Sequence, residues 1–304
     1  MKRFRTSILS AVAALAGLTL SSGAMAQATW NLYSSGVGTN GCQQNSTNSG
    51  SFGNSWNCTG SSGATATASA WSADRGASGT ADHLTAPSTG SYYASAYLSP
   101  QGTSGFGAAS RTEGIGATSP DHAFDSFAPG TQDLLLLNFG SASVILNSIG
   151  IGWNGTNDSD ITLLRWTGST APAQVNTSST RSGDGHQNLI ASGWTLVNSY
   201  SDLASDSSAP FGGTAVNTGA TQASSWWLIS TFNSALNGGT SCKKYDGSTT
   251  TCDNSDDAFK LNFISATVVP PPPTGKVPEP GSLALAGLAL AGLFGVRRGI
   301  QKQA

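Results

Sequence analysis

The chain has 304 residues, enough for one large or two small domains. Only 10% of the residues are charged, against about 25% in an average soluble protein, so hydroxyl and amide side chains must solubilise most of the surface. Between residues 27 and 277, eight Lys and Arg stand against fifteen Asp and Glu. This net charge of −7 argues against a nucleic acid as partner.

Residues 1–26 have the three parts of a secretory signal peptide. A basic start leads into an apolar run over residues 8–20, and the small residues Ala24 and Ala26 predict cleavage after Ala26. The apolar run is shorter than the roughly 20 residues that a membrane span needs, which favours a cleaved peptide over an uncleaved anchor. We therefore expect the Sec export machinery and signal peptidase as partners. The basic residues are Lys2, Arg3 and Arg5.

Residues 27–269 are expected to form an all-β ectodomain. Short runs rich in β-branched and aromatic residues recur along it, each bounded by Gly, Asn, Asp, Ser or Pro, and no window shows a helical stripe. This spacing favours an antiparallel β-sandwich or a jelly roll. The predicted strands are residues 64–71, 134–139, 144–153, 161–166, 193–198, 226–232 and 258–269.

The first part of the ectodomain differs from the rest. Residues 27–63 consist mostly of Gly, Ser, Asn and Thr, and predict a long surface loop or an irregular edge hairpin. Residues 64–71 alternate, so the alanines would share one face of a strand and Trp71 would lie on the other.

The four cysteines, an even number in an exported chain, predict disulfides. Of the three possible connectivities we favour the local one, Cys42–Cys58 and Cys242–Cys252, because each bond would close a loop rich in Gly and Ser. A loop of that size is stabilised by roughly 3 kcal/mol. The alternative is a zinc site, but no histidine neighbours either pair at ligand spacing.

Eight tryptophans are the most conspicuous apolar side chains. An exposed tryptophan could stack on a sugar ring, and Trp56, in the loop between Cys42 and Cys58, is the candidate for carbohydrate contact. Most of the others lie in predicted strands and are expected in the core.

No pattern in the sequence identifies a set of catalytic residues. His83, His122 and His186 lie beside or near an Asp, as an oriented general base would, but neighbours in an extended segment point to opposite sides. Glu113 is the only glutamate of the ectodomain. We expect no enzyme and no cofactor. The alternative function is a surface hydrolase acting on polysaccharide, with Asp121 and His122 as its first candidates.

Two acidic runs are candidates for calcium. Residues 157–160 and 253–257 gather oxygen ligands, and the second run, with Asp253, Asp256 and Asp257, is the better candidate. Neither run has the spacing of an EF-hand loop. Turn formation by Asp and Asn side chains is the competing explanation of both runs.

The C-terminal segment begins with a proline-rich linker at residues 270–276, which should end the folded domain. The motif Val277, Pro278, Glu279 and Pro280 follows, then an apolar run over residues 281–296 that predicts a short helix. A basic end over residues 297–304 starts with Arg297 and Arg298. The arginine pair orients this helix with its C-terminus in the cytoplasm. A simple C-terminal anchor is one explanation of the segment.

These three parts, in this order, resemble the PEP-CTERM sorting signal recognised by exosortases, membrane enzymes of Gram-negative bacteria that usually coexist with exopolysaccharide production. The resemblance implies an exosortase as partner, with Pro278, Glu279 and Pro280 as recognition residues. It also implies processing near these residues, loss of the helix, transient anchoring in the inner membrane, and release to the cell surface or beyond.

A second likeness covers about 100 residues of the ectodomain. It is similar to a recurring group of exosortase-dependent surface proteins of unknown biochemical role. This likeness implies a location and no activity. The segments that carry it are residues 133–139, 149–153, 158–161, 192–196 and 226–229. Together, these features favour a non-enzymatic protein of the cell surface or extracellular matrix, associated with exopolysaccharide.

Overall fold

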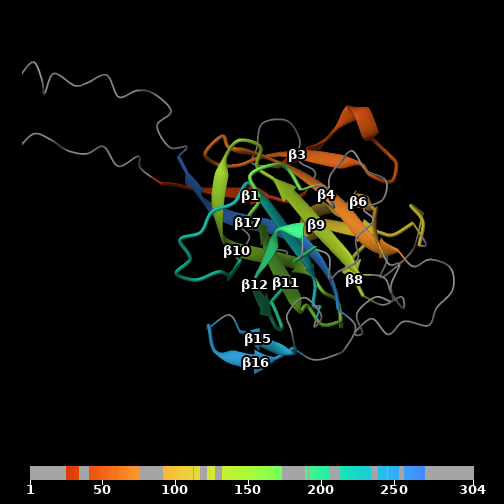
Figure 1. Ribbon diagram of the computed structural model, residues 1–304. Helices are drawn as coiled ribbons and strands as arrows, with labels where there is room; N and C mark the ends of the chain where they lie inside the picture. Colours follow the sequence, from red (N-terminus) through yellow and green to blue (C-terminus); the bar gives the residue numbers. More distant parts are fainter. Residues whose placement is uncertain are drawn as a thin grey trace, which may run out of the picture. The chain divides into compact units, whose positions relative to one another are not determined.

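The structure is a computed structural model that describes twelve stretches of the chain (Figure 1). They are residues 25–33, 41–74, 92–111, 113–116, 122–126, 132–172, 189–190, 192–205, 213–233, 239–244, 246–252 and 257–270. The chain divides into two units, residues 1–270 and 271–304, and the described residues all belong to the first. The predicted sorting helix and most of the signal peptide lie outside the described residues.

The first of two sheets is built around the long strand β17. In the described residues it has seven strands in the order β13, β10, β17, β7 and β6, with β1 and β8 also paired to β17. All the strands that contact β17 run antiparallel to it. The bounds are β1 Ala26–Asn31, β6 Tyr97–Pro100, β7 Phe106–Ala109, β8 Phe124–Asp125, β10 Ser143–Trp153, β13 Thr214–Ala215 and β17 Ala258–Val269.

The second sheet contains ten described strands. Their order is β16, β15, β12, β11, β14, β9, β4, β3 and β2, with β5 paired to β4. Its pairings are antiparallel except for the single contact between β12 and β15. The bounds are β2 Cys42–Gln44, β3 Ser55–Thr59, β4 Thr65–Asp74, β5 Tyr92–Ser95, β9 Asp133–Asn138, β11 Ile161–Trp166, β12 Trp194–Tyr200, β14 Trp226–Thr231, β15 Ser241–Lys243 and β16 Thr249–Thr251.

The seven predicted strands are all present, with ends shifted by no more than three residues. The prediction for residues 27–63 is only partly right. β2 and β3 form the expected edge hairpin, but β1 is a strand of the first sheet, and its Trp30 is fully buried. The alternation of Ala28, Trp30 and Leu32 with Thr29 and Asn31 is a local strand signal, which the polar composition of the rest of residues 27–63 masked.

The core fills the space between the sheets. Side chains from β1, β10 and β17 of one sheet meet those from β4, β9, β11 and β14 of the other. Ala66, Ala68 and Ala70 point into this core and Trp71 lies on the opposite face, as their alternation predicts.

The outer face of the second sheet is also buried. The leucine run of β9 serves both faces, with Leu135 and Leu137 in the central core and Leu134 and Leu136 in a second cluster. A strand buried on both faces reads as a continuous apolar run. The second cluster contains Trp71, Tyr93, Leu134, Leu136, Leu164, Trp166, Leu189, Trp194 and Leu228.

Both predicted disulfides are present, and each joins neighbouring strands. Cys42 pairs directly across from Cys58 in the hairpin of β2 and β3, and both are buried in the central core. The Cys242–Cys252 bond links the region of β15 and β16 and packs with Phe232. The first bond is therefore part of the core, in addition to closing a loop.

Two glycines let β7 lie against neighbouring backbone. A Cβ atom on Gly107 would lie 1.4 Å from the carbonyl oxygen of His122, and one on Gly105 would lie 2.1 Å from the carbonyl oxygen of Leu261. Gly105 also has a φ of +98°, which L residues with a side chain rarely adopt. Neither position has room for a larger residue.

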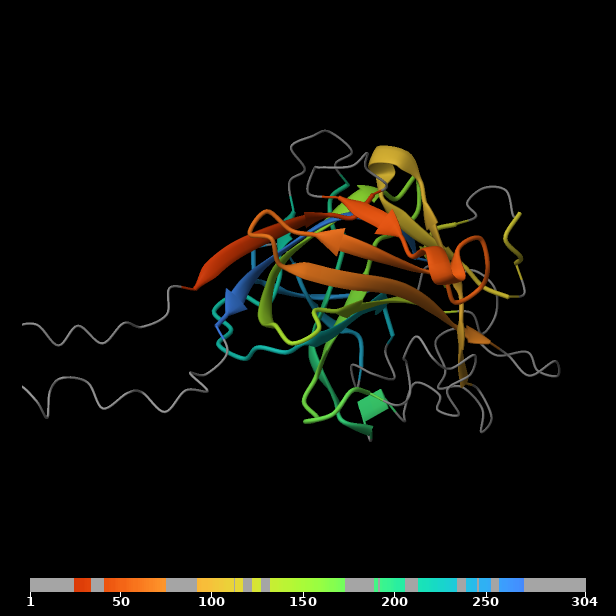
Figure 2. The ribbon, with the colours of Figure 1, turned by 90° about the horizontal axis from the view of Figure 1, so that it is seen from above.

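The first and last described strands lie together. Figure 2 shows the red β1 beside the blue β17, and the register places Ala26 opposite Val268. Cleavage after Ala26 would leave the mature N-terminus, Gln27, paired with Thr267. The structure does not test the cleavage, and Ala24 lies outside the described residues.

Candidate functional site

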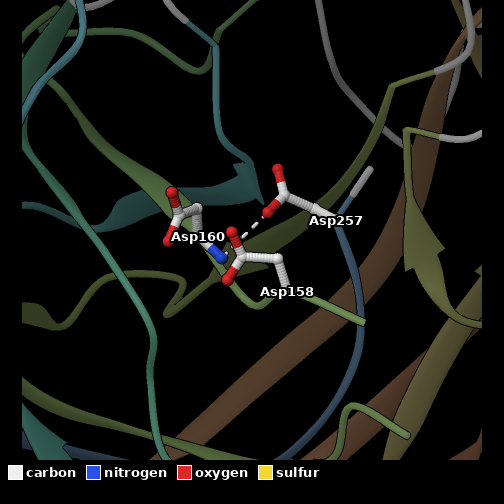
Figure 3. Close-up of side chains that lie close together, drawn as sticks. All are labelled: Asp158, Asp160 and Asp257. Atoms are coloured by element: carbon white, nitrogen blue, oxygen red, sulfur yellow. Dashed lines mark hydrogen bonds between the residues drawn. The ribbon is translucent and has the colours of Figure 1, made fainter. Parts of the chain in front are cut away.

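Three carboxylates from distant parts of the sequence meet in one cluster (Figure 3). Asp158 and Asp160 precede β11, Asp257 precedes β17, and one oxygen atom from each lies within 4.8 Å of those of the other two. The backbone N–H of Asp160 donates to Oδ1 of Asp257 at 2.9 Å, across 97 positions of sequence. The sequence marks the two acidic runs separately, and only the fold brings them together. Asp253 and Asp256 lie outside the described residues.

Backbone N–H groups hold each carboxylate in place. Oδ2 of Asp257 accepts a hydrogen bond from the N–H of Phe232 at 3.1 Å. Oδ1 of Asp160 accepts one from the N–H of Asp202 at 2.8 Å. Oδ1 of Asp158 accepts one from the N–H of Ser159 at 2.7 Å. The cluster therefore ties the starts of β11 and β17 to the end of β14.

The cluster is buried and its members share one sign of charge. Asp160 and Asp257 are 2% and 3% exposed, and Asp158 is half-buried. Burial raises the pKa of the Asp257 carboxyl well above its ordinary value, and the negative charges of Asp160 and Asp158 raise it further. The two backbone hydrogen bonds to Asp257 oppose this shift without cancelling it.

Two events would relieve this repulsion. One carboxyl can bind a proton, or the three oxygens can bind a cation. Calcium binds oxygen ligands at about 2.4 Å, so two ligands on opposite sides of the ion lie about 4.8 Å apart. The spacing of the cluster is compatible with that geometry. These three aspartates are the described residues that could hold a metal.

Without divalent cations, acidification from pH 7 towards pH 5 is expected to stabilise the protein. In the folded state Asp257 keeps its proton to a higher pH than the ordinary carboxyl of the unfolded chain, whose pKa is about 3.9. Between these two values the folded state binds more protons, so stability falls as pH rises. Thermal unfolding midpoints at pH 5, 6 and 7 in EDTA measure the effect. A midpoint that falls on acidification would contradict it.

The Asp158→Asn variant tests the cluster directly. The amide keeps an oxygen for the N–H of Ser159 and removes one negative charge beside Asp257, so the variant should be more stable at pH 7 and less sensitive to pH. Asp246→Asn is the matched control, because Asp246 is exposed and hydrogen bonds from Ser248 lower its pKa. Calcium at pH 7 gives the second readout. Stabilisation that Asp158→Asn abolishes would identify a cation site.

A second group of acids surrounds Asp133, at the start of β9. Asp133 is fully buried, and its pKa is raised well above the ordinary value, first by burial and then by the charges of Asp125 and Glu113. The N–H of Asp125 faces Oδ2 of Asp133 at 3.5 Å. Glu113 accepts a hydrogen bond from the N–H of Ser110 at 2.6 Å. The sequence gives no spacing that would have selected this group.

The residues considered for hydrolysis are not assembled into a site in the described part of the chain. His122 is half-buried with its ring against Tyr97, and its buried Nδ1 has no hydrogen-bond partner among the described residues. No described carboxylate therefore orients the ring through Nδ1, as the acid of a catalytic pair would. Asp121, His83 and His186 lie outside the described residues.

The prediction that Trp56 is exposed is wrong. Its ring is 6% exposed, packs against Phe106 and donates a hydrogen bond from Nε1 to the carbonyl oxygen of Leu98. Alternation in β3 places Trp56 on the inner face of the sandwich, which the polar composition around it conceals. Of the eight tryptophans, the two that keep more exposure are Trp153 and Trp226.

Three hollows that share lining residues lie at the end of β11 and along β12. The first, of about 560 Å³, contains Trp166 and Trp226. The second, of about 380 Å³, shares Arg165 with the first. The third, of about 290 Å³, shares Val197, Asn217 and Thr218 with the second. We call these three hollows together the β12 groove. Sequence analysis did not single it out, because its residues come from separate turns and strand ends.

The predicted sorting residues Val277, Pro278, Glu279, Pro280, Arg297 and Arg298 all lie outside the described residues. Within the described stretches, no helix has the length and apolar character required to cross a membrane.

Comparison with known proteins identifies the C-terminal segment. Residues 276–298 match the family model of the PEP-CTERM protein-sorting motif. The match covers the Pro-Glu-Pro motif, the apolar run and the arginine pair. No curated protein and no solved structure was found to match the chain.

Proposed function

We propose that this PEP-CTERM, exosortase-sorted surface protein is a non-enzymatic component of the cell surface or extracellular matrix, associated with exopolysaccharide. The match over residues 276–298 carries the proposal, since it assigns the chain a processing partner and a destination. The ectodomain would be the part that remains outside the cell and carries the function.

The distribution of acids in the ectodomain supports a binding role over catalysis. Asp133 and Asp257, whose pKa values are raised by burial, are at most 3% exposed. The β12 groove is lined by no carboxylate among the described residues. Glycoside hydrolysis needs two carboxyl groups that reach the substrate. The described acids and the described hollows are separate, which weighs against the alternative of a polysaccharide hydrolase.

We expect the protein to be anchored in the inner membrane only transiently. The apolar run over residues 281–296 is about as short as a membrane helix can be, and prolines just before it would keep the recognition segment extended. The exosortase would act near Pro278, Glu279 and Pro280, and the helix would remain behind. The ectodomain would then reach the surface or the medium.

Intact mass and location in wild-type cells and in cells lacking the exosortase test this proposal. We expect the mature protein to lack residues 1–26 and the C-terminal helix, and to leave the membrane only when the exosortase is present. Replacement of Pro278, Glu279 and Pro280 by alanine should block release in wild-type cells, because the apolar run and the arginines remain but the recognition residues are gone.

A full-length C-terminus retained in the membrane in both strains would contradict the proposal and make the C-terminal segment a simple anchor. Activity of the purified protein on a polysaccharide, lost on replacement of Asp121 or His122, would support the hydrolase instead.

A further inference from the structure

The charges along the β12 groove are opposite to those of the ectodomain as a whole. Between residues 27 and 277 acids outnumber bases by fifteen to eight. Among the described residues, however, the charged side chains that line the groove are Arg165, Lys243 and Lys244. Asp246 lies in the same hairpin turn and is not part of the lining; its carboxylate accepts a hydrogen bond from the N–H of Ser248, and the charge of Lys244 also contributes to lowering its pKa, so Lys244 is partly balanced by this acid. The groove is therefore a cationic strip on an acidic protein.

The remaining lining is polar and neutral at most positions. Hydroxyl and amide side chains of Ser, Thr, Asn and Gln surround the three bases, so the groove offers both donors and acceptors. Arg165 marks the junction of the first two hollows, where its Nη2 donates to Oε1 of Gln222. A guanidinium held by one amide keeps further N–H groups for a ligand.

One end of the groove has aromatic walls. Trp166 packs edge-on against Trp194, with 5.4 Å between ring centroids, and its Nε1 donates to the carbonyl oxygen of Thr170 at 2.6 Å. Trp226 lines the same hollow and is only partly buried. These contacts fix Trp166, while Trp226 retains ring surface on which an apolar face of a ligand can pack.

The other end is held by a disulfide. Lys243 and Lys244 belong to the hairpin of β15 and β16, which lies beneath β12 in the view of Figure 1. This hairpin pairs with β12 in the sheet through one residue pair, Tyr200 with Lys243, and the carbonyl oxygen of Lys243 accepts a hydrogen bond from the N–H of Ser201. The Cys242–Cys252 bond closes the hairpin immediately beside the two lysines. The disulfide thus restrains the position of the cations relative to the rest of the groove.

From this arrangement we propose that the β12 groove binds a carboxylated polysaccharide, with Arg165, Lys243 and Lys244 facing its acidic groups and Trp226 packing on a sugar ring. The inference rests on the proposed matrix function and names its ligand class. The second and third hollows together are lined by β12 from Thr195 to Tyr200, about 16 Å at the rise of a strand, which is long enough for more than one sugar ring. DNA carries a charge for every 1.7 Å or so of duplex, and three cations on a protein of net negative charge match the sparser charge of an acidic polysaccharide better.

Binding of polygalacturonate to the full chain, with dextran as a neutral probe and single-stranded DNA as another polyanion, tests the proposal. We expect saturable binding to polygalacturonate, weakened by salt, and none to dextran. Arg165→Gln should weaken it about tenfold, the loss of one charged contact. Lys243→Gln with Lys244→Gln should weaken it at least as much. Arg111→Gln is the matched control, since it changes net charge equally on an exposed side chain outside the groove.

The outcomes test ligand binding by the groove independently of the sorting proposal. Equal losses in Arg111→Gln and Arg165→Gln would reduce the binding to overall charge and overturn the groove. Tighter binding to DNA, or no binding to polygalacturonate, would overturn the ligand class, while the mass and location of the exported protein would still decide sorting. Trp226→Ala should weaken binding and Trp226→Phe should restore most of it. Unchanged thermal midpoints would exclude misfolding of the variants.

Discussion

Trp30→Ala is expected to destabilise the ectodomain by about 3–5 kcal/mol, the range for removal of a large buried aromatic side chain. Trp30 is fully buried and lies edge-on against Phe139, with ring centroids 5.2 Å apart. Its Nε1 donates to the carbonyl oxygen of Ala64 at 3.1 Å, so the ring ties β1 to the other sheet. Alanine would leave a cavity between the sheets, and the carbonyl oxygen of Ala64 would lose one of its two donors and keep the N–H of Gly60.

Urea unfolding with the disulfides intact measures this loss, and thermal unfolding should show a fall of about 10 °C for a domain of this size. Trp153→Ala is the matched control. Trp153 lies on the same sheet but is half-buried, with Lys260 over its ring at 4.5 Å from the centroid. That contact is worth about 1 kcal/mol. Equal losses in the two variants would show that Trp30 does not join the sheets as described.

Gly107→Ala is expected to cost about 3 kcal/mol or more, at or above the usual upper limit for overpacking. The added Cβ would lie 1.4 Å from the carbonyl oxygen of His122 and 2.4 Å from its carbonyl carbon. Backbone atoms cannot rotate away as a side chain can. β7 would have to move off residues 122–123, which would break the hydrogen bond from the N–H of Ala108 to the carbonyl oxygen of Ala123.

Gly116→Ala separates this steric effect from the general effect of replacing glycine. A Cβ on Gly116 has no atom within 4 Å and its φ is not in the left-handed region, so the variant should be neutral or slightly stabilising. Unfolding midpoints of the two variants, measured under the same conditions, distinguish the steric clash from the general effect of replacing glycine. A stable Gly107→Ala protein would mean that β7 and residues 122–123 lie further apart.

The strands that the sequence predicts are those in which most residues are apolar. β9, β14 and β17 are buried on one or both faces and stand out against a polar background. The strand β1 has a local signal, the alternation of Ala28 and Trp30 with polar residues, but it lies in a mostly polar segment. The short strands β5 to β8 have small or polar residues between few anchors, so their register depends on contacts with β17 and β4 that no local pattern shows. Tertiary pairing decides these segments.

The candidate sites also divide into those that the sequence predicts and those that only the fold assembles. Cysteine count and export predicted the Cys42–Cys58 and Cys242–Cys252 bonds, because each pair lies close in sequence. The aspartate cluster joins positions about one hundred residues apart, and each half alone looks like a turn. The β12 groove had one available signal. Lys243 and Lys244 are adjacent in an ectodomain with few bases, yet their neighbours in space come from other strands.

The pairing of β1 with β17 determines how the ectodomain would respond to mechanical force. β17 ends at Val269, with β10 along one side and β1 along the other. A pull applied at residue 270 would act along the strand axis and load the hydrogen bonds of both ladders together, in shear, instead of opening them one after another. An ectodomain anchored through this end and holding a polymer in the β12 groove would transmit tension from one sheet to the other through the packed core.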